Sequence, residues 1–187
     1  LGDIYRAKED WSGLAKILER EADALRGERK IDTICKIAEL YEDQLNDLVE
    51  ATRQYEAALA LDAMSLTALK GLDRIFNRTG RYKELLDNLD KQIHIAATPR
   101  QKINLFERMA GIHEEEFLDH DKAAQTLESI LAIDAAHENA LTGLVRHYRA
   151  LGRWEDVTRL YERHLAIVTD DKRRVELLLA MGRVLVE

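Results

Sequence analysis

Proline, cysteine and glycine-rich segments are scarce in this 187-residue sequence. Pro99 is the single proline, which suits long uninterrupted helices because proline costs about 3 kcal/mol inside a helix. Cys35 is the single cysteine, so the chain has no internal disulfide and no multi-cysteine metal site. A single thiol also favours a reducing compartment, and we expect a cytoplasmic protein.

Positive net charge and long apolar runs are also missing. The formal net charge is -7, which argues against a nucleic-acid partner because phosphate binding draws on lysine and arginine. The most apolar stretch, residues 175–186, contains Glu176 and Arg183 and is too short to cross a bilayer. The sequence therefore predicts no nucleic-acid partner and no membrane span, and its acidic balance suits a protein partner.

Patterns that carry catalysis, metals or cofactors are absent as well. The six histidines include no His-Glu-x-x-His pair and have no cysteine partner for zinc. Gly71, Gly80, Gly143 and Gly152 are single glycines and form no phosphate-binding loop. Glu114–Glu116 is interpreted as a solvated helix face, since successive carboxylates on a helix point in different directions. We therefore predict no catalytic residue, no metal and no cofactor, and hence a protein that is not an enzyme.

The sequence does contain an internal duplication. Shifting residues 36–94 by 72 positions matches them without a gap onto residues 108–166. Sixteen of the 59 aligned residues are identical, whereas chance would give roughly four. Each block divides into two units of roughly 34 to 38 residues, and each unit has the periodicity of two amphipathic helices. The identical charged residues include Glu42 with Glu114 and Arg74 with Arg146.

Turn signals mark where these helices begin and end. Gly152 is expected to end a first helix, because glycine adopts the left-handed conformation that a helix end needs. Residues 98–101 predict an N-cap threonine, a proline in the first turn and a capping glutamine. Asp47 and Asp119 each precede a second helix.

Small, aromatic and large residues recur at fixed spacing within the units. One unit carries Ile34, Ile37, Ala38, Tyr41, Ala51, Tyr55, Ala58, Leu59 and Asp62. Another carries Leu141, Leu144, Tyr148, Gly152, Trp154, Val157 and Tyr161. This spacing resembles the tetratricopeptide repeat (TPR), or a close TPR-like helical repeat, over the whole chain. The resemblance implies an all-α fold, a right-handed α-solenoid of antiparallel helix pairs that forms a TPR-like superhelix.

Both ends of the chain match the interior of a unit. Residues 1–5 match 144–148, so the chain is expected to begin inside a first helix. Residues 178–182 match 106–110, so it is expected to end after a first helix without a second. We expect a single array, a fragment of a longer protein, divided into segments 1–26, 27–64, 65–98, 99–136, 137–170 and 171–187.

The last helix is expected to leave an apolar stripe uncovered. Leu178, Met181 and Leu185 lack the second helix that covers their counterparts in other units. Stacked repeats normally need a polar cap, so self-association through this exposed terminal helix is a further partner hypothesis.

Several aromatic residues and histidines are interpreted as packing residues. Trp11, Tyr82 and Trp154 occupy one equivalent position at the start of a second helix. A ligand-binding aromatic ladder is the alternative, but repeat units must stack to bury their apolar faces, which favours packing. His113 and His164 stand where other units carry an aromatic or a small residue.

Charged residues on the first helices are the candidate binding site. If the resemblance holds, these helices line the concave side, and their inward residues alternate in sign along the array. In one interpretation, the charges of adjacent first helices form ion pairs with each other, at about 0 to 1 kcal/mol per exposed pair. In the other, they form a groove for a mixed-charge peptide or helix. Both interpretations can hold at once. For a groove, Arg74→Glu with Arg146→Glu is expected to keep the fold and weaken partner binding. The candidate residues are Glu39, Glu42 and Asp43, then Lys70, Arg74 and Arg78, then Glu114 and Glu115, then Arg146 and Arg149.

The resemblance implies a protein–protein interaction scaffold that binds a partner peptide or helix in its concave face. The family's lysine and asparagine clamp for a C-terminal carboxylate is not reproduced, because the corresponding positions hold Cys35 and Glu39, then Lys70 and Arg74. Two alternatives stay open: a structural spacer or self-assembly segment, and a regulatory sensor segment of a larger multidomain protein.

Overall fold

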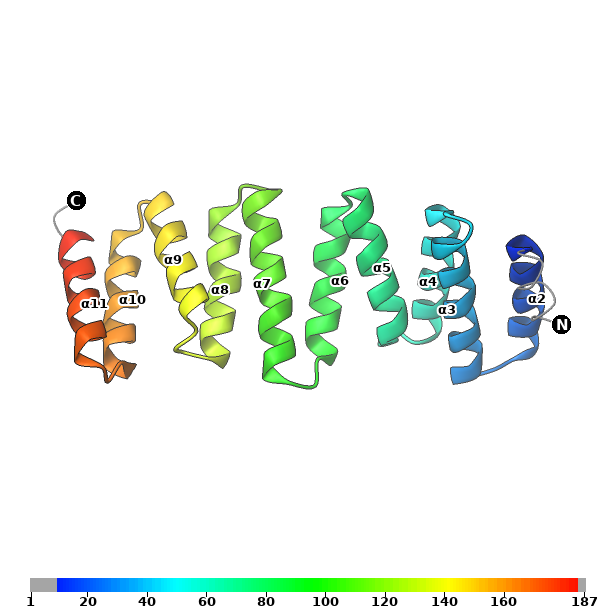
Figure 1. Ribbon diagram of the computed structural model, residues 1–187, viewed down its shortest axis with the longest axis horizontal. Coiled ribbons are helices and arrows are strands. Elements are labelled where there is room, and N and C mark those ends of the chain that lie inside the picture. Colours follow the sequence, from blue (N-terminus) through cyan, green and yellow to red (C-terminus); the bar gives the residue numbers. More distant parts are fainter. Residues whose placement is uncertain (1–9, 185–187) are drawn as a thin grey trace. The chain divides into compact units, whose positions relative to one another are not determined.

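The computed structural model describes residues 10–184, and helices joined by short turns make up this part of the chain (Figure 1). No strand occurs among the described residues, as the all-α prediction requires. The expectations for residues 1–5 and for Leu185 lie outside them. The chain forms two compact units, with the boundary between Ile95 and Ala96, and each is described by itself.

The first unit is a row of antiparallel helices, each packed against the next. Its fully buried side chains include Ile37, Tyr55, Leu69 and Leu85. Besides these sequential contacts, α3 also touches α5, so two first helices lie next to each other. The helices are α2 (Trp11–Ala24), α3 (Glu28–Asp43), α4 (Leu48–Leu61), α5 (Leu66–Thr79) and α6 (Tyr82–Ile95).

The second unit repeats the arrangement, again with each helix packed on the next. Its core joins Ala110 of the first helix to Ile130, Leu144 and Val157 of the following three. The helices are α7 (Pro99–Glu115), α8 (His120–Ile133), α9 (Glu138–Ala150), α10 (Trp154–Ile167) and α11 (Asp171–Val184). Each described helix of both units lies inside one predicted segment; the division into repeats and the right-handed superhelix stay predictions.

The helix ends follow the local signals of the sequence. Thr98 and Gln101 form a capping box, in which each side chain accepts a hydrogen bond from the other residue's backbone N–H at 3.2 Å. Asp47 and Asp119 accept hydrogen bonds from backbone N–H groups at 3.0 Å, which confirms both as N-caps. Gly152 follows α9 with φ of 67°, the left-handed conformation expected of it.

Two equivalent turns hold non-glycine residues in the left-handed region. Asn46, between α3 and α4, has φ of 50°, and Leu118, between α7 and α8, has φ of 52°. Asparagine enters this region readily, whereas a leucine pays a steric cost there. Leu118 is also 76% exposed, so the second unit carries a strained apolar residue where the first carries a polar one.

Two glycines let successive helices approach closely. A Cβ at Gly71 of α5 would lie 2.2 Å from the ring of Tyr55 in α4. A Cβ at Gly143 of α9 would lie 2.7 Å from Cδ1 of Leu127 in α8. Each glycine follows its neighbour by sixteen residues, so the same close approach occurs once in each unit.

Candidate functional site

Glu42 is the buried centre of a polar network that joins α3, α4 and α5. Its side chain is 2% exposed. Arg74 donates from Nε to Oε1 at 3.0 Å and from Nη2 to Oε2 at 2.6 Å, a two-pronged pairing. The hydroxyl of Tyr55 donates to Oε2 at 3.1 Å and accepts from Arg74 Nη2 at 3.1 Å. Burial, with Glu42 beside it, raises the pKa of Tyr55 above its ordinary value, so the phenol stays a donor.

The same carboxylate pairs with two of three cations that lie along α5. Arg78 Nη1 lies 4.0 Å from Oε1 of Glu42, and its Nη2 donates to Oδ1 of Asn46 at 3.3 Å. Arg74 and Arg78 are nevertheless about half exposed, at 50% and 49% of their side-chain surface. Lys70, one turn earlier on α5, is exposed too. We call Lys70, Arg74 and Arg78 the α5 cationic row.

The second unit carries the equivalent ion pair in a more open form. Arg146 Nη2 donates to Oε2 of Glu114 at 2.6 Å, and Glu114 is 28% exposed. The shift that aligns the two blocks places Leu127 at the position of Tyr55, so no phenol hydroxyl serves this carboxylate. Arg149 lies with its guanidinium 5.8 Å from the centre of the Trp154 ring.

The structure thus brings together some of the predicted residues. It pairs Glu42 with Arg74 and Arg78, and Glu114 with Arg146. Three other predicted acidic side chains are exposed on the first helices: Glu39, Asp43 and Glu115.

The burial of Glu42 corrects one expectation. Its carboxylate is enclosed by internal partners and is not presented to another protein. Arg74→Glu would set a second carboxylate against it, and removing one partner of a buried pair costs up to about 3–5 kcal/mol. The expected intact fold of the Arg74→Glu variant therefore does not agree with the structure.

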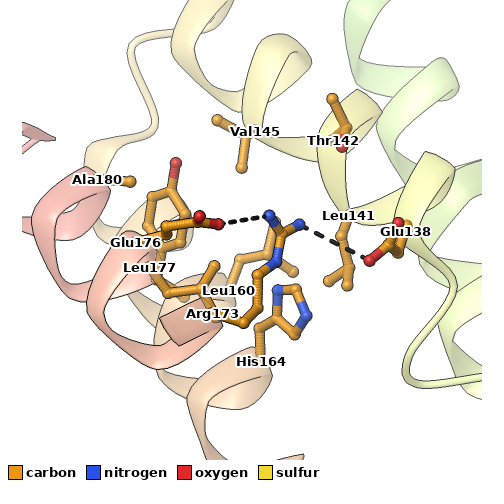
Figure 2. Close-up of a pocket in the computed structure, with 11 residues that line it drawn as sticks. Glu138, Leu141, Thr142, Val145, Leu160, His164, Arg173, Glu176, Leu177 and Ala180 are labelled. Carbon is orange, nitrogen blue, oxygen red and sulfur yellow. Dashed lines mark hydrogen bonds and ion pairs between the residues drawn. The ribbon is translucent and has the colours of Figure 1, made fainter. Parts of the chain in front are cut away.

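A cavity of about 320 Å³ lies between α9, α10 and α11 (Figure 2). At its rim, Arg173 donates from Nη1 to Oε2 of Glu176 at 3.0 Å and places Nη2 3.7 Å from Oε1 of Glu138. Burial, and then Arg173, lowers the pKa of the lining residue His164, while Glu138 opposes them. Its apolar walls are Leu141, Val145, Leu160, Tyr161, Leu177 and Ala180.

Sequence reasoning missed this cavity, although one signal for it exists. Tyr161 is followed after sixteen residues by Leu177, the spacing at which Gly71 and Gly143 follow their neighbours. Leu177 brings a side chain to the place where α5 and α9 have none, and it lines the cavity together with Tyr161. Leu177 and Tyr161 therefore both contribute side chains to the walls of this space.

The residues interpreted as packing residues differ in burial: Trp11 and Tyr82 are partly buried, whereas Trp154 is 40% exposed. Trp11, Tyr82 and Trp154 are the first residues of α2, α6 and α10. His164 is buried, and the ring of His113 lies 6.2 Å from that of Phe117.

Cys35 lies in α3 with 3% of its surface exposed. Burial raises the pKa of its thiol, which agrees with a small helix residue and not with a nucleophile.

Two negative findings concern the described residues alone. Within residues 10–184, no cluster of three or more histidine, cysteine, aspartate or glutamate side chains is suited to a metal ion. No helix in this range combines the length and the apolar character that a membrane crossing requires.

Comparison with known proteins identifies the class of fold. The model of the tetratricopeptide repeat family matches residues 118–182. The chain is similar to the crystal structure of MamA, with a TM-score of 0.52 and 19% identity over 89% of this chain and 93% of that one. A tetratricopeptide repeat protein from Parabacteroides merdae gives a TM-score of 0.56 and 14% identity over 99% and 73% of the two chains.

A curated relative points the same way. Superkiller protein 3 of Schizosaccharomyces pombe is 25% identical over 136 residues, which are 71% of this chain and 10% of that protein. The chain thus spans about a tenth of this relative's length. Together these matches agree with the predicted resemblance: residues 118–182 match the tetratricopeptide repeat family, and the solved structures share the all-α helical-repeat fold of the described residues. Such repeats generally mediate protein–protein interaction and are generally not catalytic.

Proposed function

We propose that the chain is an interaction scaffold that holds a mixed-charge peptide or helix of a partner protein on the face of its first helices. The observation that carries the proposal is the way Glu42 holds Arg74 and Arg78 while half of each side chain faces solvent. A fixed guanidinium loses less conformational freedom on binding than a mobile one. Glu42 occupies Nε and Nη2 of Arg74, and the N–H groups on Nη1 can still donate to a partner carboxylate.

The charges on the first unit define the partner's chemistry. The α5 cationic row would attract carboxylates, and the exposed Glu39 and Asp43 on the neighbouring α3 would attract basic side chains. Such complementarity acts mainly on association rate and selectivity, and salt weakens it. A partner segment with one acidic and one basic edge fits this face best.

The second unit adds an apolar anchor point. The cavity between α9, α10 and α11 has room for one large apolar side chain, and the Glu138, Arg173 and Glu176 side chains surround it with charge. A buried aromatic or aliphatic anchor with a polar rim is the usual source of binding energy in a small interface.

A charge-swap experiment tests the proposal. Peptides selected on the full chain from a random displayed library serve as probes. Lys70→Glu combined with Glu39→Lys keeps the net charge but exchanges one charge between α5 and α3, and we expect it to weaken the selected peptides at least tenfold. A peptide whose charges opposite positions 39 and 70 are reversed should regain affinity for this variant. Glu56→Lys with Lys83→Glu, on second helices, is the matched control and should bind as the wild type does.

One structural observation favours the spacer alternative. The pairs Glu42–Arg74 and Glu114–Arg146 each link two consecutive first helices of one unit, which is a use of charge that needs no ligand. If no mixed-charge peptide is selected, or if both charge-swap variants bind alike, these charges serve the internal register of the repeats.

A further inference from the structure

Two histidines meet between α8 and α9, in a place that the proposed function does not use. Nδ1 of His120 lies 3.0 Å from Nδ1 of His147, and the ring centres are 5.3 Å apart. His147 is 1% exposed. At this distance one nitrogen must donate its hydrogen to the lone pair of the other, so the contact requires at least one neutral ring.

The surroundings of His147 decide which ring donates. Its Nε2 lies 3.7 Å from Oε2 of Glu114, so a hydrogen on Nε2 faces the carboxylate favourably, whereas a lone pair there would be repelled. His147 with its hydrogen on Nε2 has a lone pair on Nδ1. The geometry therefore assigns His120 as the Nδ1–H donor and His147 as the acceptor.

The first unit shows that the repeat does not need this pair. The equivalent positions hold Leu48 and Ile75, neither of which titrates, and Ile75 is 1% exposed. Two apolar residues in the first unit thus correspond to two titratable rings in the second unit.

The charged groups facing His147 come from each element packed around it. Glu114 of α7 faces Nε2, His120 of α8 faces Nδ1, and Arg146 precedes it on α9. One proton can enter the pair, because His147 can then donate from Nδ1 to a His120 that has moved its own hydrogen to Nε2. A second proton leaves two N–H groups and two positive charges facing each other at 3.0 Å, which no tautomer relieves.

We propose that the His120–His147 pair is an acid-sensitive latch, which holds α8 against α9 while the two rings share at most one extra proton and releases them when both are protonated. The latch rests on the geometry of this pair and is independent of the proposed partner binding.

The sign of the effect follows from the burial of His147. Burial lowers its pKa, Arg146 and His120 act in the same direction, and Glu114 opposes them. A histidine whose pKa is lower in the folded than in the unfolded state does not reduce the free energy of unfolding at pH values above its unfolded pKa of about 6.5. As the pH falls below that value the unfolded chain binds more protons, and the stability of this unit is lost progressively.

Thermal unfolding between pH 8 and pH 5 tests the latch. The variant with His120→Leu and His147→Ile installs the pair of the first unit, and we expect its unfolding midpoint to fall at least about 2–4 °C less on acidification than that of the wild type. His94→Gln removes a histidine that is 70% exposed and should keep the wild-type response. An unchanged acid response in the double variant would overturn the proposal.

Ring nitrogen shifts in the wild type give a second, independent readout. Above pH 7.5 we expect the hydrogen of His147 on Nε2 and that of His120 on Nδ1. A hydrogen on Nδ1 of His147 at high pH would refute the assigned donor and acceptor, and with them the latch, even if the double variant failed to fold.

Discussion

Tyr55 and Gly71 are in such close contact that the glycine's missing side chain is a condition of the packing between α4 and α5. A Cβ at position 71 would lie 2.2 Å from the Tyr55 ring, and Tyr55 is fully buried with its hydroxyl bound to Glu42. The ring has no free direction in which to move. In the first unit, the close approach of α4 to α5 and the burial of the Glu42 carboxylate therefore depend on each other.

We accordingly expect Gly71→Ala to destabilise the chain by more than about 2 kcal/mol, despite the roughly 1 kcal/mol that alanine gains in helix propensity. Gly143→Ala is the matched control, because its nearest neighbour is the flexible end of Leu127 at 2.7 Å and can shift. Denaturant unfolding of both variants measures the difference. Equal losses would show that the Tyr55 ring yields as easily as the leucine.

The left-handed Leu118 offers a stabilising change. Leu118→Asn installs the residue found at the equivalent position 46, and we expect it to raise the free energy of unfolding by about 0.5–1 kcal/mol. The reverse change, Asn46→Leu, should lower it, because it adds strain and removes the acceptor of Arg78. The denaturant unfolding midpoints of the two variants, compared with that of the wild type, test both expectations. A destabilised Leu118→Asn variant would mean that the leucine makes a favourable contact.

Self-association through the exposed apolar residues of α11 remains a prediction. Of the predicted stripe, Leu178 is 54% exposed and Met181 is partly buried, and Val175 and Leu179 add exposed apolar surface at 55% and 60%. We expect the chain to show concentration-dependent association in sedimentation, and Leu178→Glu with Leu179→Lys to abolish it. Leu61→Glu with Met64→Lys, at exposed apolar residues at the end of α4 and in the turn after it, should leave association unchanged. Association that survives the α11 variant would exclude this face.

The cavity in the second unit can be filled from its edge. Thr142 is an exposed residue of α9 that lines it, so Thr142→Arg should obstruct entry without disturbing the core. We expect at least a tenfold loss of affinity for selected peptides that carry a large apolar side chain. Asn139→Arg adds the same charge to the same helix outside the cavity lining and serves as the control. Equal binding by both variants would remove the cavity from the interface.

Local signals were enough to predict much of the fold from the sequence. The caps at Asp47 and Thr98 depend on side chains that reach only three residues along the chain, and the helix faces follow from periodicity. The burial of Glu42 did not follow, because it depends on Tyr55 in the next helix and on the absence of a side chain at Gly71. A charged residue on a helix is ordinarily exposed, and only tertiary packing reverses that.

The histidine pair was missed for a similar reason. His120 and His147 are 27 residues apart and belong to no metal or catalytic spacing, so the sequence offered no reason to join them. Comparison with Leu48 and Ile75 was the available signal, since two histidines replace two apolar residues at equivalent positions. The cavity needed the same kind of comparison. Gly143 and Gly71 occupy the place of Leu177 one and three helix pairs earlier in the sequence.

Cys35 gives the first unit a natural reporter of its own motion. Its thiol is enclosed in α3, so a thiol reagent can react only when that helix opens. The rate of modification under native conditions therefore measures how often α3 detaches, and its denaturant dependence tells local opening from global unfolding. Because this is the only cysteine of the sequence, the measurement needs no engineered label and no background correction.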